Sequence, residues 1–348
     1  MDAVARAAGV HQTTVSLALR DHPRIPEKTR ERIKAIAAKL GYRANPYVSA
    51  FVASRYHGRN IRRATLGYVT SDKIEHGGRG AISDYADLYA GAKERAEELG
   101  YGLDHLWLGD PKLTSARFHQ ITDTRNIYGL LIAPMAVKSR TLDIDWRKFA
   151  VVAYGFSMSE PHVHRVVPDF YHSMIDILAR CRSVGYRRIG LVLDNNSDRK
   201  NDHFWLAPFI AEPRFTLGAS SVEPLLFPAA WDAQLFEGWY AAQKPDVVIA
   251  LNKIFRKIET WARSRDLQPG RDLQLVMLNV TENPGERGSA GAYLDRRRAG
   301  AASVEQLAAM LNRNERGIPK HPHTLLIKTG WSSGPTFTEL RDRDSRHE

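Results

Sequence analysis

The chain opens with VARAAGVHQTTVSLALR, residues 4–20, and this stretch decides the fold of its N-terminal part. Ala5 and Ala8 fall on one face of a short helix, and Val15 belongs to the apolar face of a second. Gly9 lies between them and can adopt the positive φ of a tight turn. A helix-turn-helix requires a small residue at the crossing, a glycine in the turn and an apolar anchor about six residues later. The alternative is a helical hairpin whose small residues serve packing alone.

The outward face of the second predicted helix carries mostly short polar side chains. These outward positions are Gln12, Thr13, Ser16 and Leu17. Such side chains reach base edges and phosphates when a helix lies in the major groove of DNA. The pattern therefore favours a recognition helix over a hairpin with no further role.

A third helix is predicted after Pro26, which with Glu27 suits a first helical turn. The apolar residues that follow it are spaced i, i+3, i+4 and i+7, and Gly41 stands where a left-handed C-cap belongs. This helix would complete a small three-helix core.

The next segment, NPYVSAFVASR at 45–55, has the pattern of one more short helix. Asn45 can cap it, Pro46 suits its first position, and Phe51 belongs to its apolar stripe. Alone it is too short to be stable, so we expect it to fold only against a partner, such as DNA or a second copy. Residues 56–63 are predicted to be a basic linker.

Positive charge is concentrated at the start of the chain. Residues 1–63 hold thirteen Lys or Arg and four acidic residues, a net charge of +9 of the +11 of the whole chain. A basic first sixth on a nearly neutral body is typical of a region that binds a polyanion, most often nucleic acid. A solvated, soluble face is the alternative that charge alone leaves open.

From residue 64 onward, predicted strands alternate with helices. Strands are expected at 65–71, 103–108, 127–134, 149–155, 187–194, 222–227, 246–251 and 273–278, and helices at 85–101, 115–125, 169–186, near 231–243 and at 254–265. Such alternation predicts parallel sheets with right-handed crossovers. The number of strands favours two lobes, each with its own sheet.

Several classes of protein are disfavoured by what the sequence lacks. No apolar run is long enough for a membrane span and no signal peptide is recognisable, so a cytoplasmic, nucleoid-associated protein is expected. The single cysteine, Cys181, excludes an internal disulfide. No nucleophile, phosphate-loop, dinucleotide or zinc motif is found, so we expect neither an enzyme nor a cofactor or metal. The HPH at 321–323 is interpreted as a loop entering the last strand, and Arg296, Arg297 and Arg298 as a solvated helix face.

The N-terminal part resembles the DNA-binding head of the LacI/GalR family of bacterial repressors. The pattern VA..AGV...TVS..L is met at residues 4–19, and TR.RI...A..LGY..N at residues 29–45. The resemblance implies that Gln12 and Thr13 read bases. It also implies that Thr14, Ser16 and Asn45 touch phosphates or order the interface.

The same resemblance implies that 46–54 is the hinge helix of a dimer, with Phe51 as the apolar wedge in the minor groove. The chain departs from the family at several positions. His11 stands where a serine usually caps the recognition helix, and Leu17, in place of a frequent Arg or His, would offer an apolar contact to DNA. The family has a few more residues before Met1, so we expect either a start further upstream or a weakened first helix.

The body resembles the periplasmic-binding-protein-like sensor of the same family. The fold class expected is therefore a small all-α helix-turn-helix head plus an α/β two-lobed, type I periplasmic-binding-protein-like domain with parallel sheets. The domains expected are a head at 1–45, a hinge helix and linker at 46–63, and a body at 64–334, with lobe 1 at about 64–157 and 288–316 and lobe 2 at about 158–282 and 320–334. The tail, 335–348, is expected to be disordered.

In this fold the small-molecule site lies between the lobes, at the carboxyl ends of the strands. The resemblance places there Ser71 and Asp72, Arg199, Asn252 and Asn279. Asn279 stands where the family often has an acid, and Asn252 is followed by Lys253 where an Asn-Asp pair is common. Because carboxylates are the acceptors that suit sugar hydroxyls, their loss argues against a simple sugar as effector.

The function expected is that of a homodimeric repressor. It would bind a pseudo-palindromic DNA operator and be controlled by a small-molecule effector, for which a carbohydrate-related compound is a candidate. The alternative is a small-molecule binding protein of the periplasmic type, which accounts for the body but leaves the basic head unexplained.

Overall fold

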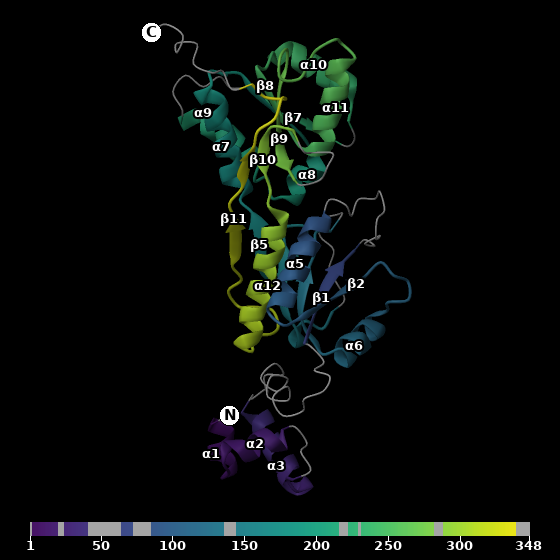
Figure 1. The fold of residues 1–348 in the computed structure, drawn as a ribbon, viewed down its shortest axis with the longest axis vertical. Coiled ribbons are helices and arrows are strands. Elements are labelled where there is room, and N and C mark those ends of the chain that lie inside the picture. The colour runs from purple at the N-terminus through teal and green to yellow at the C-terminus, as the bar shows by residue number, and fades with distance from the viewer. Residues whose placement is uncertain are drawn as a thin grey trace. The chain divides into compact units, whose positions relative to one another are not determined.

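The computed structural model describes residues 2–19, 24–40, 64–71, 85–135, 144–215, 222–228, 231–281 and 288–338. The predicted hinge and linker at 46–63, with Asn45 and Phe51, and the loop residue Asp72 lie outside the described residues. The chain divides into two units. The first comprises Met1–Ala64 with Ala309–Glu315 and holds the N-terminal helices, and the second is a large α/β unit of Thr65–Ala308 and Arg316–Glu348 (Figure 1).

The small unit is a three-helix head. It consists of α1 (Asp2–Ala8), α2 (Gln12–Ala18) and α3 (Glu27–Lys39). Gly9 has a φ of +62° in the turn between the first two helices, as the sequence predicts. The core of the head is made of buried small and branched residues: Val4, Ala5, Ala8, Val15, Ala18, Ile33 and Ala37. The helix-turn-helix expected from residues 4–20 is confirmed.

The large unit holds two six-stranded sheets. Sheet A has the order β11-β5-β4-β3-β1-β2 and is parallel throughout. Its strands are β1 (Thr65–Thr70), β2 (Gly102–Trp107), β3 (Ile127–Ile132), β4 (Ala150–Tyr154), β5 (His164–Pro168) and β11 (Thr324–Ile327). We call this sheet and its helices lobe 1.

Sheet B, which with its helices forms lobe 2, has the order β12-β10-β9-β8-β6-β7. Its strands are β6 (Ile189–Asp194), β7 (Leu225–Phe227), β8 (Val247–Ala250), β9 (Gln274–Val280), β10 (Gly291–Tyr293) and β12 (Gly330–Ser332). All neighbours in it are parallel except β12, which runs antiparallel to β10. The predicted fold class, a helical head plus an α/β domain with parallel sheets, is confirmed.

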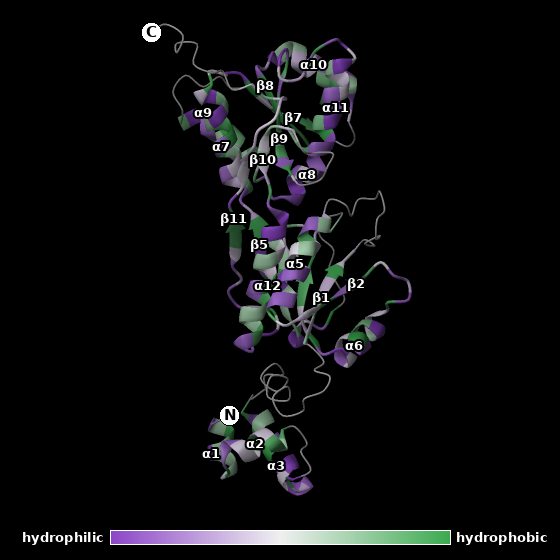
Figure 2. Ribbon diagram, viewed as in Figure 1, coloured by the Kyte–Doolittle hydropathy of each residue, from purple (hydrophilic) through white to green (hydrophobic). Residues whose placement is uncertain are grey.

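Helices cover the sheets. Those of the large unit are α5 (Ala86–Glu98), α6 (Ser115–Thr124), η2 (Trp146–Lys148), α7 (Phe170–Ser183), α8 (Asn195–Lys200), α9 (Leu206–Phe215), α10 (Ala233–Gln243), α11 (Asn252–Arg263) and α12 (Arg296–Asn312). Figure 2 shows that the strands of both sheets are mainly hydrophobic, whereas the helices combine hydrophobic and hydrophilic residues, as expected of helices that bury one side.

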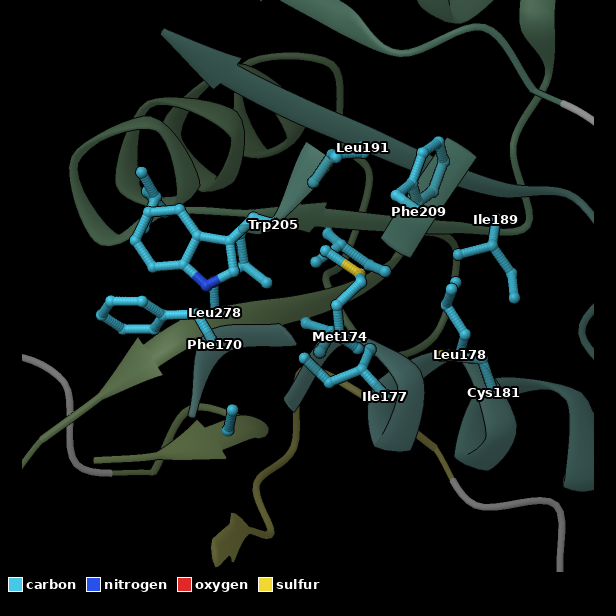
Figure 3. Close-up of a cluster of buried hydrophobic side chains, with 14 of the residues drawn as sticks. Phe170, Met174, Ile177, Leu178, Cys181, Ile189, Leu191, Trp205, Phe209 and Leu278 are labelled. Carbon is cyan, nitrogen blue, oxygen red and sulfur yellow. The ribbon is translucent and has the colours of Figure 1, made fainter. Parts of the chain in front are cut away.

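The core of lobe 2 shows how a helix covers its sheet. Phe170, Met174 and Leu178 of α7 pack toward Ile189 and Leu191 of β6 (Figure 3). A separate buried cluster joins the opposite face of the same sheet to α10 and α11. Burial on both faces explains why these strands are near-continuous apolar runs.

The chain passes between the lobes three times, and each passage lies later than expected. The passages are at Asp169, at residues 294–295 and at residues 328–329, whereas the expected lobe bounds put them near 157–158, 282–288 and 316–320. The first differs because 164–168, which has no strand in the sequence interpretation, is β5 and pairs with β4 and β11. The others differ because the chain forms β10 in sheet B and β11 in sheet A before it leaves each lobe.

The first residues of the tail that the sequence predicts to be disordered, 335–338, are ordered instead. Thr336 and Phe337 are 7% and 6% exposed, and the Thr336 side chain accepts a hydrogen bond from the Ala290 N–H at 3.0 Å. Phe337 belongs to the core of lobe 2. The residues up to 338 are therefore packed on lobe 2, and those from 339 lie outside the described residues.

Candidate functional site

The head presents the predicted DNA-contacting face of α2 to solvent. Gln12 and Thr13 are exposed, and Thr14, Ser16 and Leu17 are half-buried. Val15 and Ala18, on the opposite side, are fully buried in the head core. The helix is therefore anchored by its apolar side while its polar side stays accessible.

His11 caps the recognition helix in place of the usual serine. Its φ and ψ, −71° and 150°, are those of an N-cap residue, and its Nδ1 accepts a hydrogen bond from the Thr13 backbone N–H at 3.3 Å. The same Nδ1 lies 2.7 Å from the Thr13 hydroxyl. A neutral imidazole thus satisfies one of the N–H groups that every helix start leaves without a partner.

The start of α2 is also tied to α1. The Gln12 amide donates a hydrogen bond to the carboxylate of Asp2, the first residue of α1. From α3, Arg32 donates to the Ala8 carbonyl oxygen at 3.2 Å, at the end of α1. The first contact joins α2 to α1, and the second joins α3 to α1.

The large unit contains a pocket of about 480 Å³, a volume typical of small-molecule sites. It lies where the strands of both sheets end. Its wall includes Thr70 at the end of β1, Gly155 after β4, Asp194 at the end of β6, Leu251 after β8 and Leu294 after β10. Carboxyl ends of parallel strands are the usual position for ligands in such sheets.

Two of the predicted effector residues line this pocket. Asn252, the first residue of α11, and Asn279, in β9, are both in its wall. The Asn279 side-chain oxygen accepts a hydrogen bond from the Asn252 backbone N–H at 3.0 Å. Asn279 therefore satisfies the start of α11, which has no side-chain cap of its own.

The other predicted effector residues are placed differently. Ser71 and Arg199 are not in the wall of the pocket, and Asp72 lies outside the described residues. Arg199 is exposed on α8, and the basic residue that this helix contributes to the wall is its neighbour Lys200. Since α8 is only six residues long, the sequence pattern does not determine which of its sides faces the pocket.

Aromatic residues supply much of the remaining wall, and none of them is among the effector-binding residues that the sequence predicts. They are Tyr68, Tyr85, Tyr154, Phe156, Phe170 and Trp205. Burial raises the pKa of Tyr68, and burial raises that of Tyr154 although the charge of Arg296 opposes the change. Both phenols therefore stay protonated at neutral pH and can donate hydrogen bonds to a ligand.

A buried arginine shapes one side of the pocket. Arg165 in β5 is 9% exposed and donates to the carbonyl oxygens of Gly155 at 3.0 Å and Met158 at 2.6 Å. Desolvation lowers its pKa, and its guanidinium carbon lies 6.0 Å from the centroid of the Phe156 ring. It thereby holds the segment after β4 that carries Phe156 and Ser157 into the wall.

The three arginines at the start of α12, which the sequence predicts to form one solvated face, do not share one environment. Arg297 and Arg298 are exposed and lie 2.6 Å from Glu94 and 3.4 Å from Glu305. Arg296 is 7% exposed and lines the pocket, so its environment differs from that of its neighbours.

The described residues were compared with the requirements of a metal site and of a membrane-spanning helix. They contain no group of three or more His, Cys, Asp or Glu side chains suited to a metal. His323, of the HPH segment, directly precedes β11, and its backbone N–H donates to Nδ1 of His164 at 3.2 Å. No helix in the described part of the chain is long and apolar enough to span a bilayer.

A family model for bacterial regulatory proteins of the lacI family matches residues 1–45. No curated protein is matched by the sequence. Solved structures are similar over nearly the whole chain. The transcriptional regulator CelR in complex with cellobiose is 16% identical, with a TM-score of 0.53, and the match covers 95% of this chain and 97% of that one.

The lac repressor dimer bound to operator and the anti-inducer ONPF is also 16% identical, with a TM-score of 0.54, and the match covers 96% of this chain and 98% of that one. A LacI-family regulatory protein from Chloroflexus aggregans is 16% identical at a TM-score of 0.58, over 77% of this chain and 96% of that one. These likenesses show the fold of the large unit. The head, residues 1–45, thus matches the model of the lacI family of bacterial regulatory proteins, and the chain has a fold similar to that of the solved transcriptional regulators.

Proposed function

We propose that this protein is a transcriptional repressor that binds a pseudo-palindromic operator as a homodimer and is controlled by a small molecule in the pocket of the large unit. The observation that carries the proposal is the head: a lacI-family helix-turn-helix whose α2 is anchored on one side and exposed on the other. Net charge of +9 within residues 1–63 supports binding to a polyanion.

Each predicted residue takes a distinct part in this proposal. Gln12, Thr13 and Leu17 discriminate between bases, and a good base contact is worth about 1–3 kcal/mol. Thr14, Ser16 and Asn45 contact phosphates or order the interface, and Phe51 wedges into the minor groove at the operator centre. Because phosphate contacts release counterions, affinity is expected to fall steeply with salt.

A homodimer is supported by exposed apolar side chains on lobe 1. Ile318, Leu325 and Leu326 are 53%, 44% and 48% exposed, and the two leucines belong to β11, an edge strand of sheet A. Large apolar residues on an exposed edge favour contact with another protein surface. Two heads in one dimer match the two half-sites of a pseudo-palindrome.

The proposed control follows from the position of the pocket. Its walls come from both sheets, so a ligand that binds one arrangement of the lobes more tightly shifts the population toward it. In the proposed mechanism this shift decides whether two copies of the segment 46–54 can meet and fold on DNA, and the protein works in the cytoplasm without a resident cofactor.

Selection of bound sequences from random duplex DNA with the full chain tests the proposal. We expect enrichment of a two-fold symmetric site, affinity that falls with rising salt, and a change in affinity when a metabolite panel is added. A Gln12→Ala variant should select a less defined base at one position in each half-site. A chain that enriches no duplex at any salt, while still binding a small molecule, would support a binding protein of the periplasmic type instead.

A further inference from the structure

Arg296 is a buried cation at the start of α12. Its side chain is 7% exposed, and in the described part of the chain no carboxylate pairs with it. The acids near α12 are engaged elsewhere, because Asp295 accepts from the Arg298 N–H at 2.8 Å, and Glu94 and Glu305 pair with Arg297 and Arg298. A buried charge without a partner is costly to keep, so its retention points to a ligand.

The surroundings of Arg296 direct it toward the pocket. It lines the wall, and its guanidinium carbon lies 5.0 Å from the centroid of the Tyr85 ring, which lines the same wall. Its charge also acts on the buried phenol of Tyr154, against the effect of burial on the pKa of that group. The guanidinium thus lies over one tyrosine of the wall and acts on a second, while no carboxylate among the described residues pairs with it.

The wall as a whole carries an excess of positive charge. Among its described residues the cations are Arg296, Lys200 and Lys253, and the one carboxylate is Asp194. That carboxylate accepts a hydrogen bond from the Ser197 N–H at 2.8 Å, at the start of α8. A negative group on the ligand would therefore enter a wall with three cations and one carboxylate.

The remaining wall suits a polyol. It contains four asparagine side chains, whose amides both donate and accept: Asn196, Asn201, Asn252 and Asn279. Neither phenol oxygen of Tyr68 and Tyr154 has a hydrogen-bond partner among the described residues, so both are open to a ligand. Aromatic rings such as those of Phe170 and Trp205 offer the flat apolar surface against which a sugar ring packs.

We propose that the pocket binds a carbohydrate that carries a carboxylate or a phosphate, and that Arg296 pairs with this negative group. This inference rests on the proposed function, in which the same pocket binds the effector. Unlike a site for a neutral sugar, the proposed pocket requires a negative charge on the ligand. This requirement is tested by changing the charge of the ligand and, separately, by replacing Arg296.

Calorimetric titration of the full-length protein with matched ligands tests the proposal. The pairs are D-glucuronate and D-galacturonate against D-glucose and D-galactose, and glucose 6-phosphate against glucose. Inorganic phosphate is compared with chloride at equal ionic strength. We expect a charged member to bind at least tenfold more tightly than its neutral partner, and the two arms to distinguish a carboxylate from a phosphate. Equal or tighter binding of the neutral members, or binding of no anion at all, would overturn the proposal.

Variants of α12 separate the role of Arg296 from that of its neighbours. Arg296→Met should weaken binding of the preferred anion by about 100-fold or more, as expected when a buried ion pair loses one partner. Arg296→Lys should retain part of the preference, and Arg298→Met, which changes an exposed arginine of the same helix, should bind as the wild type does. Unchanged binding by Arg296→Met would overturn the proposal.

The melting temperature of the unliganded protein gives an independent readout. Removal of an unpaired buried cation should leave it unchanged or raise it in Arg296→Met, while the increase caused by the anion should disappear. A lower melting temperature together with a retained anion response would show that Arg296 serves packing only. DNA selection on the same samples distinguishes the two proposals: a loss of anion preference alone overturns this inference, and a loss of all duplex binding overturns the proposed function.

Discussion

Gly91 of α5 lies against the backbone of Arg297 in α12, so closely that a Cβ at position 91 would come within 2.1 Å of the Arg297 carbonyl oxygen. A second glycine makes the same contact in the other direction, since a Cβ at Gly300 would lie 2.1 Å from the Leu88 carbonyl oxygen. The two helices therefore touch backbone to backbone on lobe 1. This contact sets the position of α12 and, with it, that of Arg296 at its first turn.

Gly91→Ala is expected to destabilise the protein by about 2–3 kcal/mol, because a methyl group has no space between the two backbones. The free energy of unfolding in urea measures the effect. Gly238→Ala in the exposed part of α10 is the matched control, since nothing lies within 4 Å of its added Cβ. There, alanine should stabilise by about 0.5–1 kcal/mol through helix propensity. Similar changes in the two variants would contradict the close contact.

The spacing of apolar residues predicts most of the strands and helices. The strand that it does not predict is buried only through pairing with strands distant in the sequence. The strand at 246–251 is one apolar run and was predicted, because a buried parallel strand is apolar on both faces. The strand β5 was missed since its residues include His164 and Arg165, which suit a loop. Both are buried here only because β4 and β11 flank the strand and because Arg165 bonds to the Gly155 and Met158 carbonyls.

The candidate site was predictable to the extent that it lies at strand ends. Asn252 and Asn279 each belong to a segment that ends or follows a strand, and both line the pocket. Arg296 was missed because three successive arginines suggest a solvated face, whereas helix geometry turns each of them by about 100° and directs only the first one inward. The direction of that turn is not visible in the sequence.

His11→Ala is expected to weaken the start of α2 by about 1 kcal/mol, since the N-cap acceptor for the Thr13 N–H is lost. His11→Ser should restore the cap because its hydroxyl can accept the same bond. Amide hydrogen exchange of the full chain measures the effect as faster exchange at the first amides of α2 in the alanine variant. Equal exchange in all three proteins would show that the imidazole does not cap the helix.

Phe51→Ala is expected to weaken operator binding while leaving effector binding intact, because the proposed wedge acts only on DNA. Gel shift with the selected operator measures the first quantity and calorimetry the second. Phe215→Ala, which removes an 84% exposed phenylalanine from lobe 2, is the control for loss of an aromatic side chain. Equal operator affinity in Phe51→Ala and the wild type would contradict the wedge.

Cys181 is expected to be inert in the native protein. It is fully buried in the core of lobe 2, and burial raises the pKa of its thiol to about 12 (Figure 3). A raised pKa keeps the thiol protonated at pH 8, where the thiolate is the reactive form, so a thiol reagent should modify the chain only as it unfolds. The rate of modification should follow the urea unfolding curve. Fast modification at pH 8 without denaturant would contradict the burial.

Asn279→Asp tests the hydrogen bond between Asn279 and the start of α11. A carboxylate keeps the acceptor for the Asn252 N–H and adds a charge that the helix N-terminus favours, so the variant should gain about 0.3–1 kcal/mol at neutral pH. Such a contact lowers the pKa of the new carboxyl below its unfolded value of about 4, so the gain is present above that pH and lost as the pH falls through the folded value.

Asn279→Ala removes the acceptor and should lose stability at every pH. Urea unfolding at pH 7 and pH 3 measures all three proteins, and a gain that persists at pH 3 would show that the added charge does not act on the helix. Binding of the preferred anion should weaken in Asn279→Asp at pH 7, because the wall then carries a second carboxylate beside Asp194.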